Sequence, residues 1–152
     1  MTLVVLLAVH LLSAVFWVGG MAFAYVVLRP SAGSLDSEAR LQLWHGVFRR
    51  FFPWVWTSII VLLASGYGMI LMYLGGFAGA GLYIQLMQGI GIVMMLLFLH
   101  LFFVPWRRFT HAVAGKHFAE AAKNLEQIRR IVAVNLVLGL ITIVVGASGR
   151  FW

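Results

Sequence analysis

Four long apolar runs limit what this chain can fold into. They cover roughly residues 2–28, 51–74, 82–104 and 131–147, and runs of about 20 apolar residues cross a bilayer as helices. The 152-residue chain is 63% hydrophobic and only 10% charged, and a soluble domain of this size could not bury that much apolar surface. We therefore predict a single all-α domain, residues 1–152, that is a polytopic integral membrane protein with an antiparallel bundle of four transmembrane helices.

The basic residues predict how the bundle lies in the membrane. Of the eleven Lys and Arg residues, four lie between the first two runs and six between the last two, whereas the connection Gly75–Gly81 has none. In an up-and-down bundle both basic connections lie on one side, which the positive-inside rule makes cytoplasmic. We expect the inner membrane of a bacterium, with both termini on the periplasmic side. The net charge of +7 is then a topology signal and does not indicate nucleic-acid binding.

Segments outside the runs carry helical patterns as well. Residues 34–50, SLDSEARLQLWHGVFRR, predict a cytoplasmic amphipathic helix between spans one and two, lying at the interface, with Ser34 as its N-cap. Residues 105–130 are polar and helix-prone, and we expect them to extend spans three and four into the cytoplasm. The fourth span has a stripe of small and polar residues at helical spacing, which allows close approach of a helix or a flat ligand: Asn135, Gly139, Thr142 and Gly146.

Two histidines, His10 and His100, lie within the predicted spans. Ionisable side chains in a membrane are costly and are functional candidates by default. Trp17 follows His10 by nearly two turns, about 20° away around the helix, and would flank the same pocket with Gly20 behind it. No span contains an Asp or Glu that could pair with His10. The imidazole of His10 either forms a packing hydrogen bond or binds haem iron or copper, since neutral imidazole suits both metals.

Depth separates the two histidines. His10 is about 10–12 Å below the outer boundary, whereas His100 is about 27 Å along its own span from that side. The nitrogen–iron–nitrogen axis of a haem covers only about 4 Å, so His100 would belong to a second site. Residues on the other spans lie at the level of His10: Tyr67, Met69, Met87, Gln88 and Thr142. Imidazole with the thioether of Met69 or Met87 suits haem or monovalent copper, and a homodimer pairing two copies of His10 is the alternative.

Several motifs resemble two related membrane families. The stretch HLLSAVFWVGG, with His10, Trp17 and Gly20, resembles the first span of HemJ-type protoporphyrinogen oxidases and of copper-resistance D (CopD) domains. FRRFFPWVW followed by SGYGMI is similar to their second span, and RRIVAVNLVLGL to their fourth, with Arg130 and Asn135 in corresponding places. The third span has the late histidine of the family, His100. The resemblance implies a four-helix membrane protein associated with haem or copper.

The two families imply different functions. HemJ proteins have a lysine early in the third span that works with the first-span histidine, but this chain has Gln85 and Gln88 there. Glutamine supplies neither a positive charge nor a titrating amine. HemJ also has Asn-Glu in the fourth span, whereas Leu136 follows Asn135 here. The resemblance to CopD implies copper import or tolerance.

Our leading hypothesis from the sequence is a protein of the lipid bilayer that binds haem b and transfers electrons, with a quinol or another redox partner. His10 is the axial metal ligand, and His100 marks a second metal site. The cofactor-binding candidates are His10, Trp17, Gly20, Met69, Met87, Gln88, His100 and Asn135. The alternative is copper transport or resistance, and further alternatives are a HemJ-like oxidase and an assembly subunit of a membrane complex. An enzyme of this kind would be an oxidoreductase; the sequence assigns no catalytic residue.

Overall fold

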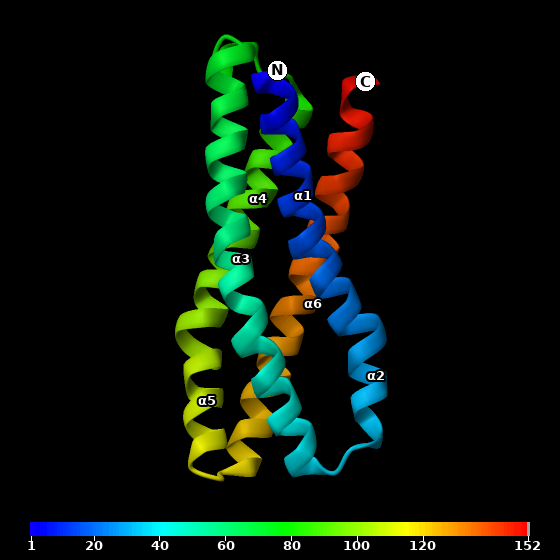
Figure 1. Ribbon diagram of the computed structural model, residues 1–152, viewed down its shortest axis with the longest axis vertical. Coiled ribbons are helices and arrows are strands. Elements are labelled where there is room, and N and C mark those ends of the chain that lie inside the picture. The colour runs from blue at the N-terminus through cyan, green and yellow to red at the C-terminus, as the bar shows by residue number, and fades with distance from the viewer. Residues whose placement is uncertain (152) are drawn as a thin grey trace.

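The protein consists of four long helical rods joined by short connections (Figure 1). The computed structural model describes residues 1–151, apart from the side chains of Ala78 and Arg150. Within these residues four helices are long and apolar enough to cross a membrane. They are Thr2–Ser34, Ser37–Tyr73, Leu82–Ala114 and Phe118–Ser148. The prediction of an all-α, four-helix membrane protein is confirmed.

Two of the rods change their helical type along their length. The first consists of α1 (Thr2–Ala22), the π-helical η1 (Phe23–Leu28), α2 (Arg29–Ser31) and η2 (Ala32–Ser34). The third consists of α4 (Leu82–Leu101), the π-helical η4 (Phe102–Trp106) and α5 (Arg107–Ala114). The other two rods are α3 (Ser37–Tyr73) and α6 (Phe118–Ser148), with short 3-10 turns η3 (Phe77–Gly79) and η5 (Gly149–Phe151). Pro105 lies inside η4, where the missing proline N–H disturbs the regular hydrogen-bond ladder.

The predicted amphipathic segment is helical and continues directly into the second span. Its N-cap is Asp36, whose carboxylate accepts the backbone N–H of Ala39 at 2.9 Å. The prediction of Ser34 was wrong, because Ser34 ends η2 and the chain is extended at Leu35. From Ser37 to Tyr73 the helix has no break, even at Pro53. Whether residues 37–50 lie at the cytoplasmic membrane surface remains a prediction.

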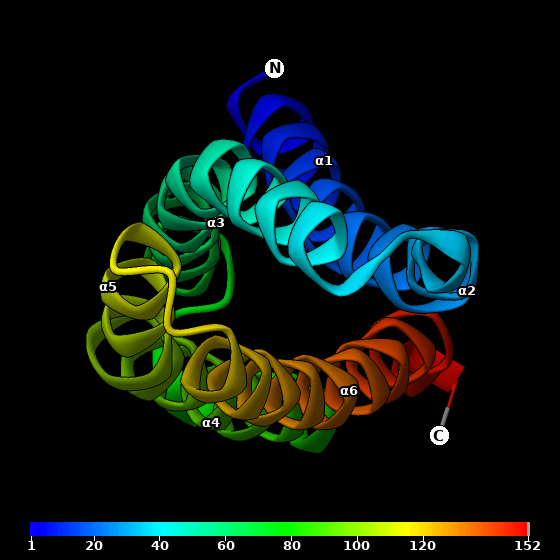
Figure 2. The same cartoon turned by 90° about the horizontal axis from the view of Figure 1, so that it is seen from below.

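The four rods form an up-and-down bundle. The two termini lie at one end with the α3–α4 connection, and the α2–α3 and α5–α6 connections lie at the other end (Figure 1). Viewed along the bundle, the order around the ring is α1, α3, α4 with α5, and α6 (Figure 2). Both basic connections are therefore at the same end, as the sequence predicts for an antiparallel bundle. We call this end the basic end and the other the terminal end.

Toward the basic end, the interior of the bundle is filled by aromatic rings from α3, α4 and η4. The Phe52 ring lies 5.1 Å from that of Trp106 and 5.6 Å from that of Phe98, edge to face in both pairs. Such geometry is favourable for the ring quadrupoles. We refer to these rings, together with Phe48 and Phe109, as the aromatic layer.

Small residues on α6 allow the rods to approach one another closely. A Cβ atom at Gly139 would lie 2.8 Å from Val18 Cγ2 on α1 and 3.2 Å from Met94 Cε on α4. A Cβ at Gly146 would lie 3.0 Å from Met87 Cε. The polar and small stripe predicted on the fourth span therefore packs against neighbouring helices, as small residues commonly do in membranes.

This packing predicts a position-specific loss of stability. Gly139→Leu should destabilise the bundle by about 1–3 kcal/mol, the usual cost of overpacking a filled core. Gly89→Leu is the matched control, because nothing lies within 4 Å of a Cβ at Gly89 on α4. Thermal unfolding of both variants in the same detergent measures the difference. Equal melting temperatures for the two variants would contradict the close packing of α6.

Candidate functional site

His10 lies on α1 and is half-buried against α3. Its Nδ1 is 2.9 Å from the hydroxyl oxygen of Ser65, which is buried. The next residue on α3 is Gly66, and a Cβ there would lie 3.2 Å from His10 Cε1. Gly66 therefore leaves the space that the imidazole occupies. Ser65 and Gly66 together form the seat of His10 on the second span.

The hydrogen bonds of Ser65 determine which nitrogen of His10 carries the proton. A serine hydroxyl has one proton, and Ser65 donates it to the backbone carbonyl of Val61, with an oxygen–oxygen distance of 2.5 Å. With its own proton on the Val61 carbonyl, Ser65 Oγ is free to accept from His10 in the tautomer that carries the proton on Nδ1. Nε2 therefore keeps its lone pair, and this is the nitrogen that can bind a metal ion.

Helical spacing places Met69 on the same face of α3 as Ser65, which contacts His10 on α1. It follows Ser65 by four residues, which is about 40° around the helix and 6 Å along it. Gly68, on the same stretch, contacts α1 through Leu6, whose Cδ1 is 3.7 Å from a Cβ built there. Side chains on a helix lean toward its N-terminus. Because α1 and α3 are antiparallel, the side chains of Met69 and His10 lean toward each other.

Met87 and Gln88 lie in the same half of the bundle as His10, on α4. The side-chain amide of Gln88 donates to the hydroxyl of Tyr67 at 3.1 Å and so joins α4 to α3. The sulfur of Met87 is 3.2 Å from a Cβ built at Gly146, which places its thioether against α6. Thr142 donates its hydroxyl to a carbonyl of its own helix. The side chain of Met87 therefore lies between α4 and α6, across the bundle from the seat of His10.

Trp17, Gly20 and Asn135 have packing contacts of their own. Trp17 is 3% exposed, with its ring 6.3 Å from that of Phe98. A Cβ at Gly20 would overlap the ring of Phe51, so a side chain there would require that ring to move. Asn135 donates to the backbone carbonyl of Met94 at 3.1 Å, and its own side-chain oxygen has no partner among the described residues. None of these three contacts involves Ser65 or Gly66, the residues that form the seat of His10.

His100 points away from the bundle interior. Its side chain is exposed on α4, whereas His45 stacks on Trp106 with ring centroids 5.4 Å apart. Among the residues that the structure describes, no three His, Asp or Glu side chains gather into a metal-binding group. A second metal site at His100 therefore stays a prediction from the sequence.

The cavity beside Gly20 does not supply the ligands that haem needs. It has a volume of about 280 Å³ and lies between η1, α3 and α6, toward the basic end. Its walls include Met21, Phe51 and Phe52, and no histidine lines it among the described residues. A haem there would lack the imidazole ligand on which the haem hypothesis rests. His10 and this cavity are thus separate features of the molecule, and the residues present do not fit a His10-ligated haem in it.

Comparison with known families decides between the resemblances seen in the sequence. The chain matches the family model of copper resistance protein D over residues 45–148, more than half of its length. This chain belongs to the copper resistance protein D (CopD) family. The CopD match includes Ser65, Met69 and Met87, whereas α1 with His10 precedes it. Comparisons with curated proteins and with solved structures gave no match, and the HemJ resemblance gains no support.

Sequence reasoning did not identify Ser65 and Gly66 as the neighbours of His10. Matching depths along ideal vertical helices selected Tyr67 and Met69, which are only two and four residues from Ser65. The stretch SGYGMI carried a usable signal, because a serine next to a glycine offers both a hydrogen-bond partner and space for a ring. Tilt of α1 against α3 (Figure 1) accounts for such an offset.

The tautomer of His10 is directly testable. In protein labelled with ¹⁵N-histidine, we expect the Nδ1–H form of His10 at neutral pH, because Ser65 accepts that proton. Ser65→Ala should increase the Nε2–H form. NMR nitrogen shifts in detergent micelles distinguish the two forms, and His10→Gln assigns the signal among the five histidines. An Nε2–H signal in the unmodified protein would contradict the arrangement described above.

Proposed function

We propose that this protein binds monovalent copper within the membrane and acts in copper transport or resistance, with the ion as its cargo. Membership of the CopD family is the observation that carries the proposal. His10 is the proposed ligand, because Ser65 holds its Nδ1–H and leaves Nε2 with a lone pair. The sequence alone favoured haem; the family match supports the copper alternative.

Met69 is the proposed thioether partner of His10. Imidazole and thioether are soft donors that suit monovalent copper, whereas carboxylates suit harder ions. None of the four acidic residues of the chain lies in a predicted span, so the pair favours a soft monovalent ion. Met87, from the α4 side, is the alternative thioether. Few neutral ligands also suit a cargo site, where an ion must bind firmly enough to enter and weakly enough to leave.

The proposal includes an orientation. We place the protein in the inner membrane of a bacterium with its basic end in the cytoplasm, because both basic connections lie at that end and cytoplasmic loops carry most Lys and Arg residues. His10 then lies in the outer half of the membrane, where it can receive copper from, or return copper to, the periplasmic side.

Copper binding should depend on His10 and on one methionine. His10→Ala should abolish binding of one Cu(I) per chain, and Met69→Leu should weaken it about tenfold or more by removing the sulfur at nearly constant volume. Titration of the detergent-purified protein against a chromogenic Cu(I) chelator measures both effects. Cells that produce each variant should show matching changes in copper tolerance or copper content.

Two variants serve as controls for this prediction. Met72→Leu makes the same change three residues further along α3, at a side chain that is 63% exposed, and His117→Ala removes an exposed histidine at the basic end. Both should bind copper normally. A Soret band in the purified protein that disappears in His10→Ala would instead favour the haem hypothesis. Unchanged copper affinity in His10→Ala would reject the proposed site.

The orientation can be tested because the chain has no cysteine. Thr2→Cys at the terminal end should react with a membrane-impermeant maleimide in intact spheroplasts. Gly33→Cys in the α2–α3 connection should react only after the membrane is permeabilised; nothing lies within 4 Å of a Cβ at Gly33, so the substitution fits. The reverse labelling pattern would show that the basic end faces outward.

A further inference from the structure

A basic pocket lies between the first rod, α3 and α6, at the basic end. Arg29 and Arg129 line it together with Tyr25 and Trp44. The guanidinium carbon of Arg29 is 5.0 Å from the ring centroid of Tyr25, and that of Arg129 is 5.2 Å from the ring centroid of Trp44. These cation–π contacts hold two positive charges at the same opening between the rods.

The positive charge in this pocket is poorly compensated. Arg129 is subject to the positive charges of Arg29 and Arg40, and Glu126 is the acidic residue that acts on it. Glu126, however, is already paired with Arg130 on the surface of α6. Arg129 therefore has only part of one carboxylate against the charge of Arg29, and an anionic ligand would relieve the repulsion between the two guanidinium groups.

Two buried donors in the same pocket lack partners. The indole N–H of Trp44 and the Nε–H of Arg129 are buried without a hydrogen-bond acceptor among the described residues. Trp44 as a whole is only 2% exposed. Buried N–H groups without an acceptor are uncommon in folded proteins and require an explanation. An anion between Arg29, Trp44 and Arg129 would supply the missing acceptor once the side chains that line this narrow pocket move apart.

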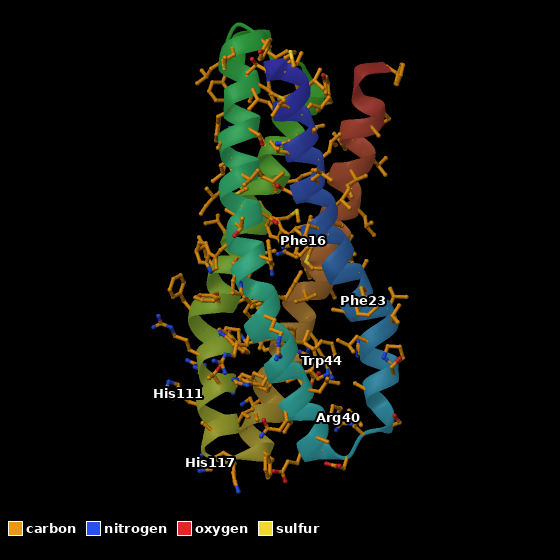
Figure 3. The ribbon with its side chains drawn as sticks, in the orientation of Figure 1. Phe16, Phe23, Arg40, Trp44, His111 and His117 are labelled. Atoms are coloured by element: carbon orange, nitrogen blue, oxygen red, sulfur yellow. The ribbon has the colours of Figure 1, made fainter. Side chains whose placement is uncertain are left out.

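The basic pocket continues into the apolar cavity of about 280 Å³. Ala24, Phe48 and Val132 line both. The π-helical segment η1 contributes a wall through Phe23, which Figure 3 labels on the first rod, across from Trp44 and Arg40 on α3. Every other residue of the cavity is apolar: Gly20, Met21, Leu28, Val47, Phe51 and Phe52. A ligand that fills both spaces has an anionic head and an apolar tail.

We propose that an anionic phospholipid binds here, with its phosphate on Arg29 and Arg129 and one acyl chain in the cavity. The predicted spans end at Leu28 and begin at Ile131, so both arginines lie at the height of lipid headgroups. Basic pockets between transmembrane helices on the cytoplasmic side commonly bind acidic lipid headgroups. Inorganic phosphate would use the same guanidinium groups but would leave the cavity empty. This proposal is independent of copper binding at His10.

Native mass spectrometry of the intact protein tests the site. We expect one phosphatidylglycerol per chain to remain bound, and phosphatidylcholine with identical acyl chains to bind at least tenfold more weakly. Arg29→Gln and Arg129→Gln should each weaken phosphatidylglycerol binding by about tenfold, the range expected when a charged hydrogen bond is lost. Arg108→Gln, on the exposed surface of α5, makes the same charge change and should bind the lipid normally.

A variant of the cavity distinguishes a lipid from a free anion. Val47 lines the cavity but not the basic pocket, so Val47→Phe should weaken phosphatidylglycerol binding and leave binding of inorganic phosphate unchanged. Arg29 is exposed, so we expect Arg29→Gln to fold. This variant tests the site even if Arg129→Gln does not fold. Equal binding of both lipids, or phosphatidylglycerol binding unaffected by Arg29→Gln and Val47→Phe, would overturn the proposal. A co-purified porphyrin that Arg29→Gln releases would overturn it as well.

Discussion

The absence of water in the bilayer interior is the constraint on which the rest of this structure depends. Backbone groups there must be satisfied within the chain, so each crossing is a helix. The same requirement applies to polar side chains, and three of them bond across helices: His10 to Ser65, Gln88 to Tyr67, and Asn135 to the carbonyl of Met94. Each bond joins two different rods. The contacts that satisfy the polar groups therefore also fix how far the rods are shifted along one another.

Close approach of the rods has a different origin from that in a soluble protein. Lipid tails are as apolar as leucine, so burial alone does not drive helices together, and small residues that permit tight packing become important. Gly139 and Gly68 have this role in contacts with Val18 and Leu6. Gly66 has it as well, but the side chain it admits is an imidazole. The proposed ligand site therefore depends, as the packing of the bundle does, on a glycine that leaves space for a side chain of the neighbouring helix.

The rods could be predicted from the sequence because apolar runs of about 20 residues have few other solutions. The approximate level of Met69 relative to His10 followed from the antiparallel order alone. Ser65 was missed because a shift of two residues, about 3 Å along the axis, depends on helix tilt, which no local pattern encodes. Ser34 was predicted as the cap in place of Asp36, because both residue types cap helices well and the residue type alone does not separate them. The π-helical segment Phe23–Leu28 contains no proline itself, but Pro30 follows it and lacks the N–H that would bond to the Val26 carbonyl.

The contrast between the two ends of the bundle bears on how copper could move. The aromatic layer, with Phe52 and Phe98 each 3% exposed, fills the interior between His10 and the basic end. In the proposed orientation, an ion at His10 would be separated from the cytoplasmic side by this layer, whereas the terminal end is nearer. Import would require the layer to open, and η4, which supplies Trp106 to the layer, is a place where one rod departs from regular α-helical geometry. Retention or return of copper on the outer side needs no such opening. The conformation described here therefore fits copper tolerance more directly than copper import.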